Sequence, residues 1–274
     1  MGERHVQAVP ADTRSQPGSF PLGRILARTD LLLGPLGLVT FLLLWQGIVV
    51  VGRYPEFILP SPGRVAARLV ALAAEGSLWW HAWITVQEIL GGLALGLTTA
   101  SVLGYFLARF HRLEKVLSPY IVVSQAIPVV ALAPLLVIWF GFGGLSKVLV
   151  CALVVFFPVL VNTVVGLRGV DQNLRDLMRA YEATRWQTFR VLELPAALPV
   201  LLGGLKVGVT LSVIGAVVGE FVGADRGLGF LVNLGQGLMD TPLMFVAIFA
   251  LVAIALALYG LVGLLERRFL AWRT

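Results

Sequence analysis

The sequence is poor in charged residues. Asp, Glu, Lys and Arg make up 13% of its 274 residues, whereas hydrophobic residues make up 58%. An ordinary soluble domain carries about 25% charged residues, which cover its water-facing surface. The composition therefore excludes a single soluble globule and a disordered chain, and it indicates a polytopic helical membrane protein.

Residues that carry metal, redox or nucleotide chemistry are also scarce. The one cysteine, Cys151, cannot form a disulfide within the chain and lies in an apolar run, so we expect it to pack. The three histidines form no metal-ligand cluster, and no nucleophile–base set is evident. No G-x-x-x-x-G-K-[ST] run is present. The sequence thus disfavours an intramembrane enzyme and an ATPase of its own.

Long apolar runs are what the sequence has in abundance. A helix that crosses a bilayer needs about 20 mostly apolar residues. We therefore predict an all-α fold with six transmembrane helices. They are expected at Leu31–Val51, Ala82–Ala108, Ser118–Phe140, Ser146–Leu167, Ala197–Val222 and Pro242–Leu265.

The basic residues predict the orientation of these helices. An even number of spans places both termini on one side of the membrane. That side holds 15 of the 21 Lys and Arg residues and the other side holds 5, while Lys206 lies inside the fifth span. Cytoplasmic loops carry the excess of Lys and Arg, so both termini are expected in the cytoplasm. Because the basic residues are scattered between apolar runs, the net charge of +6 does not indicate a nucleic-acid partner.

This topology divides the chain into four parts. We expect a mobile cytoplasmic tail over residues 1–30, and a first transmembrane helix with an external amphipathic segment over 31–81. A transmembrane core follows over 82–265, and a short cytoplasmic tail over 266–274. In the external segment, Ser61 and Pro62 predict the start of an interfacial helix whose apolar face carries Val65, Leu69 and Leu72.

The longest cytoplasmic loop, residues 168–195, holds two short helical patterns. Apolar residues recur at helical spacing in the first: Leu174, Leu177, Met178 and Tyr181. Thr184 and Gln187 form a capping-box pattern that predicts the start of a second helix, and Leu194-Pro195 predicts its end. The apolar side chains must either pack on the bundle or enter a partner's groove, and the pattern by itself favours neither.

A series of short motifs from about residue 57 to the C-terminus resembles one family. They are Leu59-Pro60-Ser61-Pro62, Ile127-Pro128, Trp139-Phe140-Gly141-Phe142-Gly143, Phe156-Phe157-Pro158, Asn162-Thr163, Arg185-Trp186-Gln187-Thr188-Phe189, Leu194-Pro195-Ala196-Ala197-Leu198-Pro199, Gly219-Glu220-Phe221 and Gly227-Leu228-Gly229. In this order they are similar to the transmembrane subunits of binding-protein-dependent ABC importers of the nitrate, sulfonate and taurine group. The resemblance implies a type I ABC importer-like fold in a bacterial inner membrane.

The family's coupling-loop pattern is present in altered form. It runs Glu-Ala-Ala, three residues, Gly, nine residues, an aliphatic residue, one residue, then Leu-Pro. Anchored on Leu194-Pro195, it places Asp176 at the Glu position, Leu192 at the aliphatic position and Glu182 at the Gly position. Because glutamate adopts positive φ only at a cost, we predict ordinary backbone dihedrals at Glu182.

The resemblance also implies partners and a mechanism. Two separate ATPase subunits would bind ATP and Mg²⁺, a second permease copy would complete the pathway, and an external binding protein would deliver the solute. This chain would hold no cofactor and no catalytic residue. The residues that would contact an ATPase lie in the loop: Asp176, Ala180, Tyr181, Glu182, Ala183, Thr184 and Trp186. Substrates within the resemblance include oxyanions, sulfonates, taurine and pyrimidine-type vitamin precursors.

Polar residues within the spans are candidates for lining the pathway. Ser124 and Gln125, and likewise Asn162 and Thr163, lie near prolines that interrupt their helices, and Glu220 lies near the outer end of the fifth span. Hydrogen bonding between helices is the alternative role for the first four, and a structural or snorkelling role is the alternative for Glu220. An alternative function also stays open at this point: a self-contained secondary transporter or channel driven by an ion gradient, in which Glu88 or Glu220 would carry the coupling proton.

Overall fold

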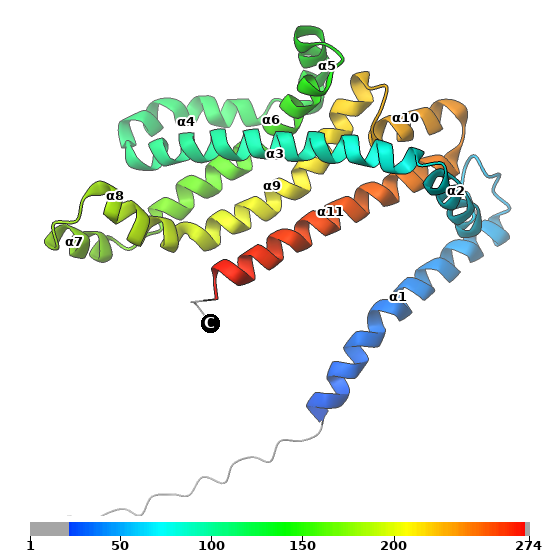
Figure 1. Ribbon diagram of the computed structural model, residues 1–274, viewed down its shortest axis with the longest axis horizontal. Helices are drawn as coiled ribbons and strands as arrows, with labels where there is room; N and C mark the ends of the chain where they lie inside the picture. Colours follow the sequence, from blue (N-terminus) through cyan, green and yellow to red (C-terminus); the bar gives the residue numbers. More distant parts are fainter. Residues whose placement is uncertain (1–21, 272–274) are drawn as a thin grey trace, which may run out of the picture. The chain divides into compact units, whose positions relative to one another are not determined.

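The structure is a computed structural model that describes residues 22–271, with side chains from residue 35 onward. Every regular element in this part of the chain is a helix (Figure 1). They are α1 (Leu22–Gly52), α2 (Pro62–Ala74), α3 (Ser77–Arg109), α4 (His111–Gln125), α5 (Val129–Phe140), α6 (Gly144–Arg168), α7 (Gln172–Ala180), α8 (Arg185–Thr188), the π-helical turn η1 (Phe189–Glu193), α9 (Leu194–Gly223), α10 (Leu228–Leu238) and α11 (Thr241–Phe269). The all-α prediction is confirmed.

Five of these helices are long and apolar enough to cross a membrane, and a sixth span results if α4 and α5 are counted together. The chain divides into two units, residues 1–53 and 54–274. The first contains α1, which begins nine residues before the expected Leu31. Residues 1–21 of the expected N-terminal tail, and 272–274 of the C-terminal tail, lie outside the described residues.

The core of the second unit is formed by α3, α6 and α9, which pack closely against one another. Close approach requires glycine at the contacts: a Cβ on Gly96 would lie 2.8 Å from the Ala152 carbonyl oxygen, and one on Gly215 would lie 2.8 Å from Cys151 Cα. Small residues allow such contacts between membrane helices. Cys151 is fully buried here, as its apolar surroundings predicted.

The third predicted span is broken rather than continuous. Helices α4 and α5 meet at an angle of 94°, with a break at residues 126–128. Pro128 has no N–H to donate and disfavours helical dihedrals in the residue before it, so a helix ends there readily. The predicted interruption of this span at Pro128 is confirmed, whereas Pro134 lies inside α5 without breaking it. Helix α4 begins earlier than the expected Ser118, at His111, and Pro119 is accommodated inside it.

The predicted external helix is present as α2. Ser61 accepts a hydrogen bond from the Arg64 backbone N–H at 3.4 Å, and Pro62 occupies the first turn. Val65 and Leu72 are buried, in a helix that packs on α11 and α3, but Leu69 is 42% exposed. The buried face of α2 thus holds two of the three residues that the sequence assigned to it.

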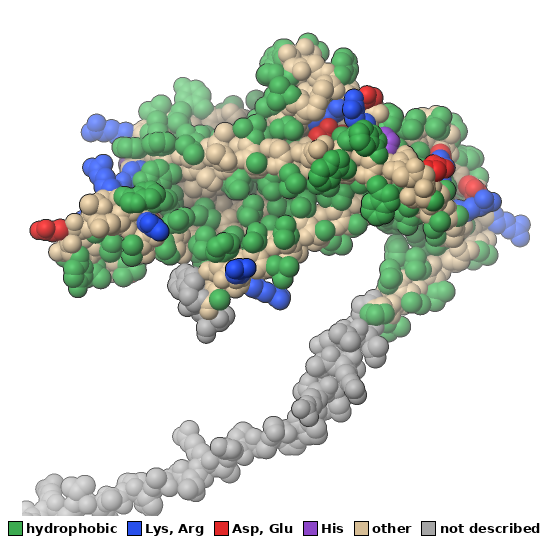
Figure 2. Space-filling view, in the orientation of Figure 1, with side chains coloured by type: hydrophobic (Ala, Val, Ile, Leu, Met, Phe, Trp, Pro, Cys, Tyr) green, Lys and Arg blue, Asp and Glu red, His purple; other side chains and the backbone are tan. Residues whose placement is uncertain are grey.

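Figure 2 shows hydrophobic side chains over most of the visible face of the second unit, with Lys and Arg gathered toward helix ends. A surface of this kind suits a bilayer, whose hydrocarbon excludes charge. The end of this unit that carries α7 and α8 is called the coupling-loop end below.

Candidate functional site

The loop 168–195 folds into two helices joined by a tight turn. Asp171 accepts a hydrogen bond from the Asn173 backbone N–H at 2.8 Å and caps α7. Thr184 begins α8 with the predicted capping box: its hydroxyl accepts from the Gln187 N–H at 3.3 Å, and the Gln187 side chain accepts from the Thr184 N–H at 2.7 Å. The capping-box prediction is confirmed because this motif depends only on neighbouring residues.

The turn between α7 and α8 contradicts the prediction of ordinary dihedrals. Glu182 has φ +52°, the left-handed conformation that a glycine would favour. The turn is a Schellman motif, in which the Ala183 N–H donates to the Met178 carbonyl at 3.0 Å and the Glu182 N–H donates to the Arg179 carbonyl at 2.9 Å. These two bonds satisfy carbonyls at the end of α7 and hold Glu182 in the conformation expected of the family's glycine.

The apolar side chains of the two helices lie largely in the open. Leu174 is 45% exposed, Leu177 50%, Tyr181 77% and Trp186 66%. No residue of α7 or α8 is buried. The sequence left two alternatives open, packing on the bundle or entry into a partner's groove. Most of this apolar surface does not pack on the bundle of this chain.

The other loop residues singled out from the sequence surround this surface. Asp176 is exposed, accepts from Arg179 at 2.8 Å and from Gln172 at 3.1 Å, and makes these contacts within α7. Ala180 is exposed and Ala183 is half-buried beside the turn. The structure thus brings all seven of these residues, from Asp176 to Trp186, into one compact element.

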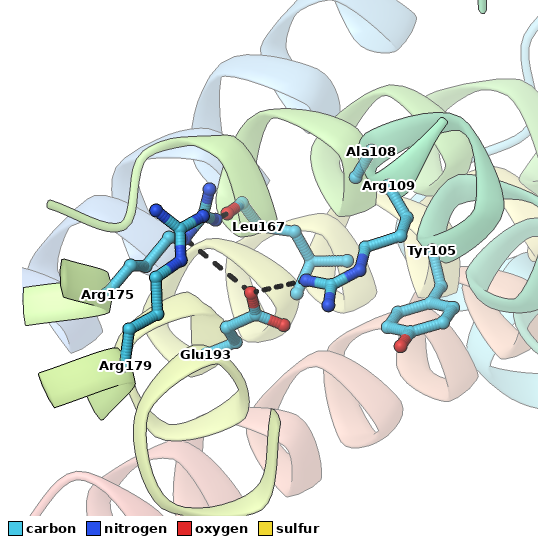
Figure 3. A pocket seen from close by; sticks show the side chains of 7 residues that line it. All are labelled: Tyr105, Ala108, Arg109, Leu167, Arg175, Arg179 and Glu193. Carbon is cyan, nitrogen blue, oxygen red and sulfur yellow. Dashed lines mark hydrogen bonds and ion pairs between the residues drawn. The ribbon is translucent and has the colours of Figure 1, made fainter. Parts of the chain in front are cut away.

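A buried carboxylate anchors this element to the bundle. Glu193, in η1, is 5% exposed. Its Oε1 lies 3.5 Å from Arg175 Nε of α7 and accepts from Arg109 Nη1 of α3 at 3.3 Å (Figure 3). Arg175 also donates to the Leu167 carbonyl at 2.6 Å. These groups line a cavity of about 320 Å³ with Arg179 and Tyr105.

Sequence reasoning missed this anchor and misplaced the end of the second helix. The chain does not leave the helix at Leu194-Pro195; α8, η1 and α9 run on as one helical stretch from Arg185 to Gly223. In the π-turn the Leu194 N–H bonds to the Phe189 carbonyl, five residues back, and Pro195 follows as the second residue of α9. A carboxylate in an otherwise apolar stretch was the only signal at Glu193.

A second polar cluster lies toward the opposite ends of α3 and α9. Glu220 is 1% exposed and accepts from the Thr85 hydroxyl at 2.6 Å and from the Gly229 backbone N–H. Glu88 is also buried, and its Oε1 lies 3.9 Å from Lys147 Nζ of α6. Glu220 therefore ties α9 to α3 and to the start of α10, and its part in a pathway stays a prediction.

The remaining pathway candidates do not bond to one another. Ser124 donates to the Tyr120 carbonyl, Asn162 to the Pro158 carbonyl and Thr163 to the Val159 carbonyl, at 2.7, 2.8 and 2.8 Å. Each bond stays within its own helix. Gln125 is exposed at the end of α4, beside the break. Their part in a pathway stays a prediction.

Comparison with known proteins agrees with this geometry. Residues 92–271 match the family described as binding-protein-dependent transport system inner membrane component. The riboflavin transport system permease protein RibX of Chloroflexus aurantiacus is 50% identical over 238 residues, 87% of this chain and 89% of the relative. The formylaminopyrimidine transport permease protein ThiX of Halalkalibacterium halodurans is 38% identical over 217 residues, 79% of this chain and 86% of the relative.

The fold itself is similar to that of a solved importer. The MetNI methionine ABC transporter, in an inward-facing conformation, matches with a TM-score of 0.59 and 20% identity over 69% of this chain and 94% of the other. The five or six apolar spans are those of a multi-spanning membrane protein. The chain belongs to the family of binding-protein-dependent transport system inner membrane components, and it is a permease subunit of an ABC importer.

Proposed function

We propose that this permease imports a flavin or a related pyrimidine-ring vitamin precursor and is driven by two separate ATPase subunits. The proposal of separate ATPase subunits rests on the exposed apolar surface of α7 and α8. Two hydrogen bonds fix the turn that joins these helices. Amphipathic helices of this kind fill hydrophobic grooves on partner proteins. The partner ATPases would hold ATP and Mg²⁺, and this chain would hold no cofactor.

The substrate class rests on the relatives. The riboflavin permease shares half of its aligned residues with this chain, and the formylaminopyrimidine permease more than a third. The aliphatic sulfonate permease of Bacillus subtilis is less similar, at 32% identity. A ring heterocycle is therefore favoured over a sulfonate. An external binding protein would deliver it, and a second copy of this chain would complete the pathway.

The orientation proposed is with both termini in the cytoplasm of a bacterium, across its inner membrane. The excess of Lys and Arg supports this orientation. It places the coupling-loop end on the side where ATP is available. The Arg168 guanidinium, which donates to the Glu114 carboxylate at 2.5 Å, then lies at the cytoplasmic ends of α6 and α4.

Transport by the reconstituted complex tests this function. The permease, its ATPase subunits and the binding protein are placed in proteoliposomes, and riboflavin uptake is followed with and without ATP. We expect uptake that needs ATP, persists in a proton uncoupler and is not competed by taurine. Uptake by the permease by itself, abolished by the uncoupler, would contradict the proposal and favour an ion-driven transporter.

A further inference from the structure

Helix α7 is attached to the rest of the described chain mainly through one side chain. None of its nine residues is buried, and only Arg175 and Met178 are partly covered. Arg175 reaches the bundle twice, through the Leu167 carbonyl at 2.6 Å and through Glu193 at 3.5 Å. Its neighbour Arg179, one turn further on, bonds instead to Asp176 of the same helix.

Glu193 joins three elements of the chain. Its carboxylate belongs to the π-turn that leads directly into α9, and it pairs with Arg175 of α7 and Arg109 at the end of α3. Figure 3 shows the two guanidinium groups approaching this carboxylate from opposite sides. The anchor formed by Arg109, Arg175 and Glu193 therefore connects the exposed loop element to two of the three core helices.

Burial makes this connection resistant to separation. The Glu193 side chain is 6% exposed, so pulling Arg175 away would leave a carboxylate with one of its two cations removed and little access to water. An exposed ion pair such as Arg179–Asp176 exchanges freely with water and contributes little. When α7 is displaced, η1 and α9 are therefore expected to move with it, because separating Arg175 from Glu193 costs more free energy.

We propose that Arg175 and Glu193 are positioning residues that transmit movement of α7 to α9 and α3, distinct from the residues that bind the ATPase. This inference rests on the proposed function, because it requires an ATPase that moves α7. The docking surface of Leu174, Leu177 and Trp186 binds the partner, and the anchor converts binding into movement of the membrane helices.

The test separates docking from transmission. Variants Arg175→Gln and Glu193→Gln are compared with Arg179→Gln, which removes the same charge from the same helix and the same cavity but breaks no ion pair of Glu193, because Arg179 pairs with Asp176. Each permease is purified with its ATPase subunits, and a fluorophore at Asp225→Cys, in a Cys151→Ala background, reports on the loop between α9 and α10. The signals measured are ATPase recovery, ATP hydrolysis, and the fluorescence change on trapping with ATP and vanadate.

We expect Arg175→Gln and Glu193→Gln to retain ATPase recovery and hydrolysis but to lose the fluorescence change by about tenfold. Riboflavin uptake per ATP hydrolysed should fall by a similar factor. Arg179→Gln should keep the native fluorescence change per ATPase recovered, and Arg175→Lys should recover part of the signal. A native-sized fluorescence change in Arg175→Gln overturns the inference. So does loss of ATPase recovery in that variant, since it would make Arg175 a docking residue.

Failure of the proposed function gives a different result. If the native permease does not recover an ATPase, the proposed energy source is wrong and the inference falls with it. If the native complex shows an ATP-dependent fluorescence change without riboflavin uptake, only the substrate is wrong, and the comparison between Arg175→Gln and Arg179→Gln remains decisive.

Discussion

Glu182 shows how a single residue can keep a conformation that its side chain disfavours. A left-handed conformation costs an L-residue roughly 1–2 kcal/mol. The Schellman bonds to Met178 and Arg179 offset that cost, and the Glu182 side chain is exposed. The hydrogen bonds of the turn therefore determine its geometry, and Glu182 adopts the positive φ that this geometry requires.

Substitution at this residue tests the turn. We expect backbone amides of residues 178–183 to exchange with solvent most slowly in Glu182→Gly and fastest in Glu182→Val, because a β-branched residue is a genuine outlier at positive φ. The two variants should differ by about 1 kcal/mol in the free energy of local opening. Hydrogen exchange with mass spectrometry measures this, and Glu182→Gln controls for the lost charge. Equal exchange in all three variants would show that the turn is not held at positive φ.

At the scale of elements, contact between α3, α6 and α9 depends on glycine. The carbonyl oxygen of Ala152 lies where a Cβ on Gly96 would be too close, and backbone cannot move aside as a flexible side chain can. Such contacts are determined by pairs of helices that are distant in sequence. A G-x-x-x-G spacing indicates that a helix can make such a contact, but it does not indicate which helix is the partner.

Adding one methyl group at this contact should destabilise the bundle. We expect Gly96→Ala to reduce stability by about 1–3 kcal/mol, as overpacking does elsewhere. Gly203→Ala is the matched control, because no atom lies within 4 Å of the position that its Cβ would take. Thermal unfolding of the purified permease in detergent measures the difference. If the two variants unfold at the same temperature, the close packing of α3 on α6 is not as described.

At the scale of the whole molecule, cysteine labelling measures the orientation of the chain in the membrane. The buried thiol of Cys151 makes labelling straightforward, because the native chain offers no exposed cysteine among its described residues. Arg112 and Asp225 are both exposed and lie near opposite ends of the core helices.

Labelling from one side of the membrane determines the orientation. In right-side-out vesicles, a membrane-impermeant maleimide should label Asp225→Cys and leave Arg112→Cys unlabelled until the membrane is permeabilised. This follows from the cytoplasmic excess of basic residues. The native protein, with Cys151 only, serves as the unlabelled control. The reverse pattern would place both termini outside the cell and contradict the proposed ATPase partnership.

The sequence by itself determined the membrane class, the approximate spans, the α8 capping box and the family. Each depends on composition or on residues close together in the chain: the bilayer fixes how long an apolar run must be, and Thr184 and Gln187 are three residues apart. The positive φ of Glu182 was less accessible, since the sequence shows the residue but not the hydrogen bonds that compensate the cost of its conformation.

Only the tertiary structure decided which polar groups meet. Arg109 pairs with Glu193 across 84 residues of sequence, and Thr85 donates to Glu220 across 135. In a mostly apolar interior, a buried carboxylate must find donors wherever packing places them, so its partners follow from the positions of whole helices. No local pattern encodes those positions, and for that reason the anchor beneath α7 became visible only in the fold.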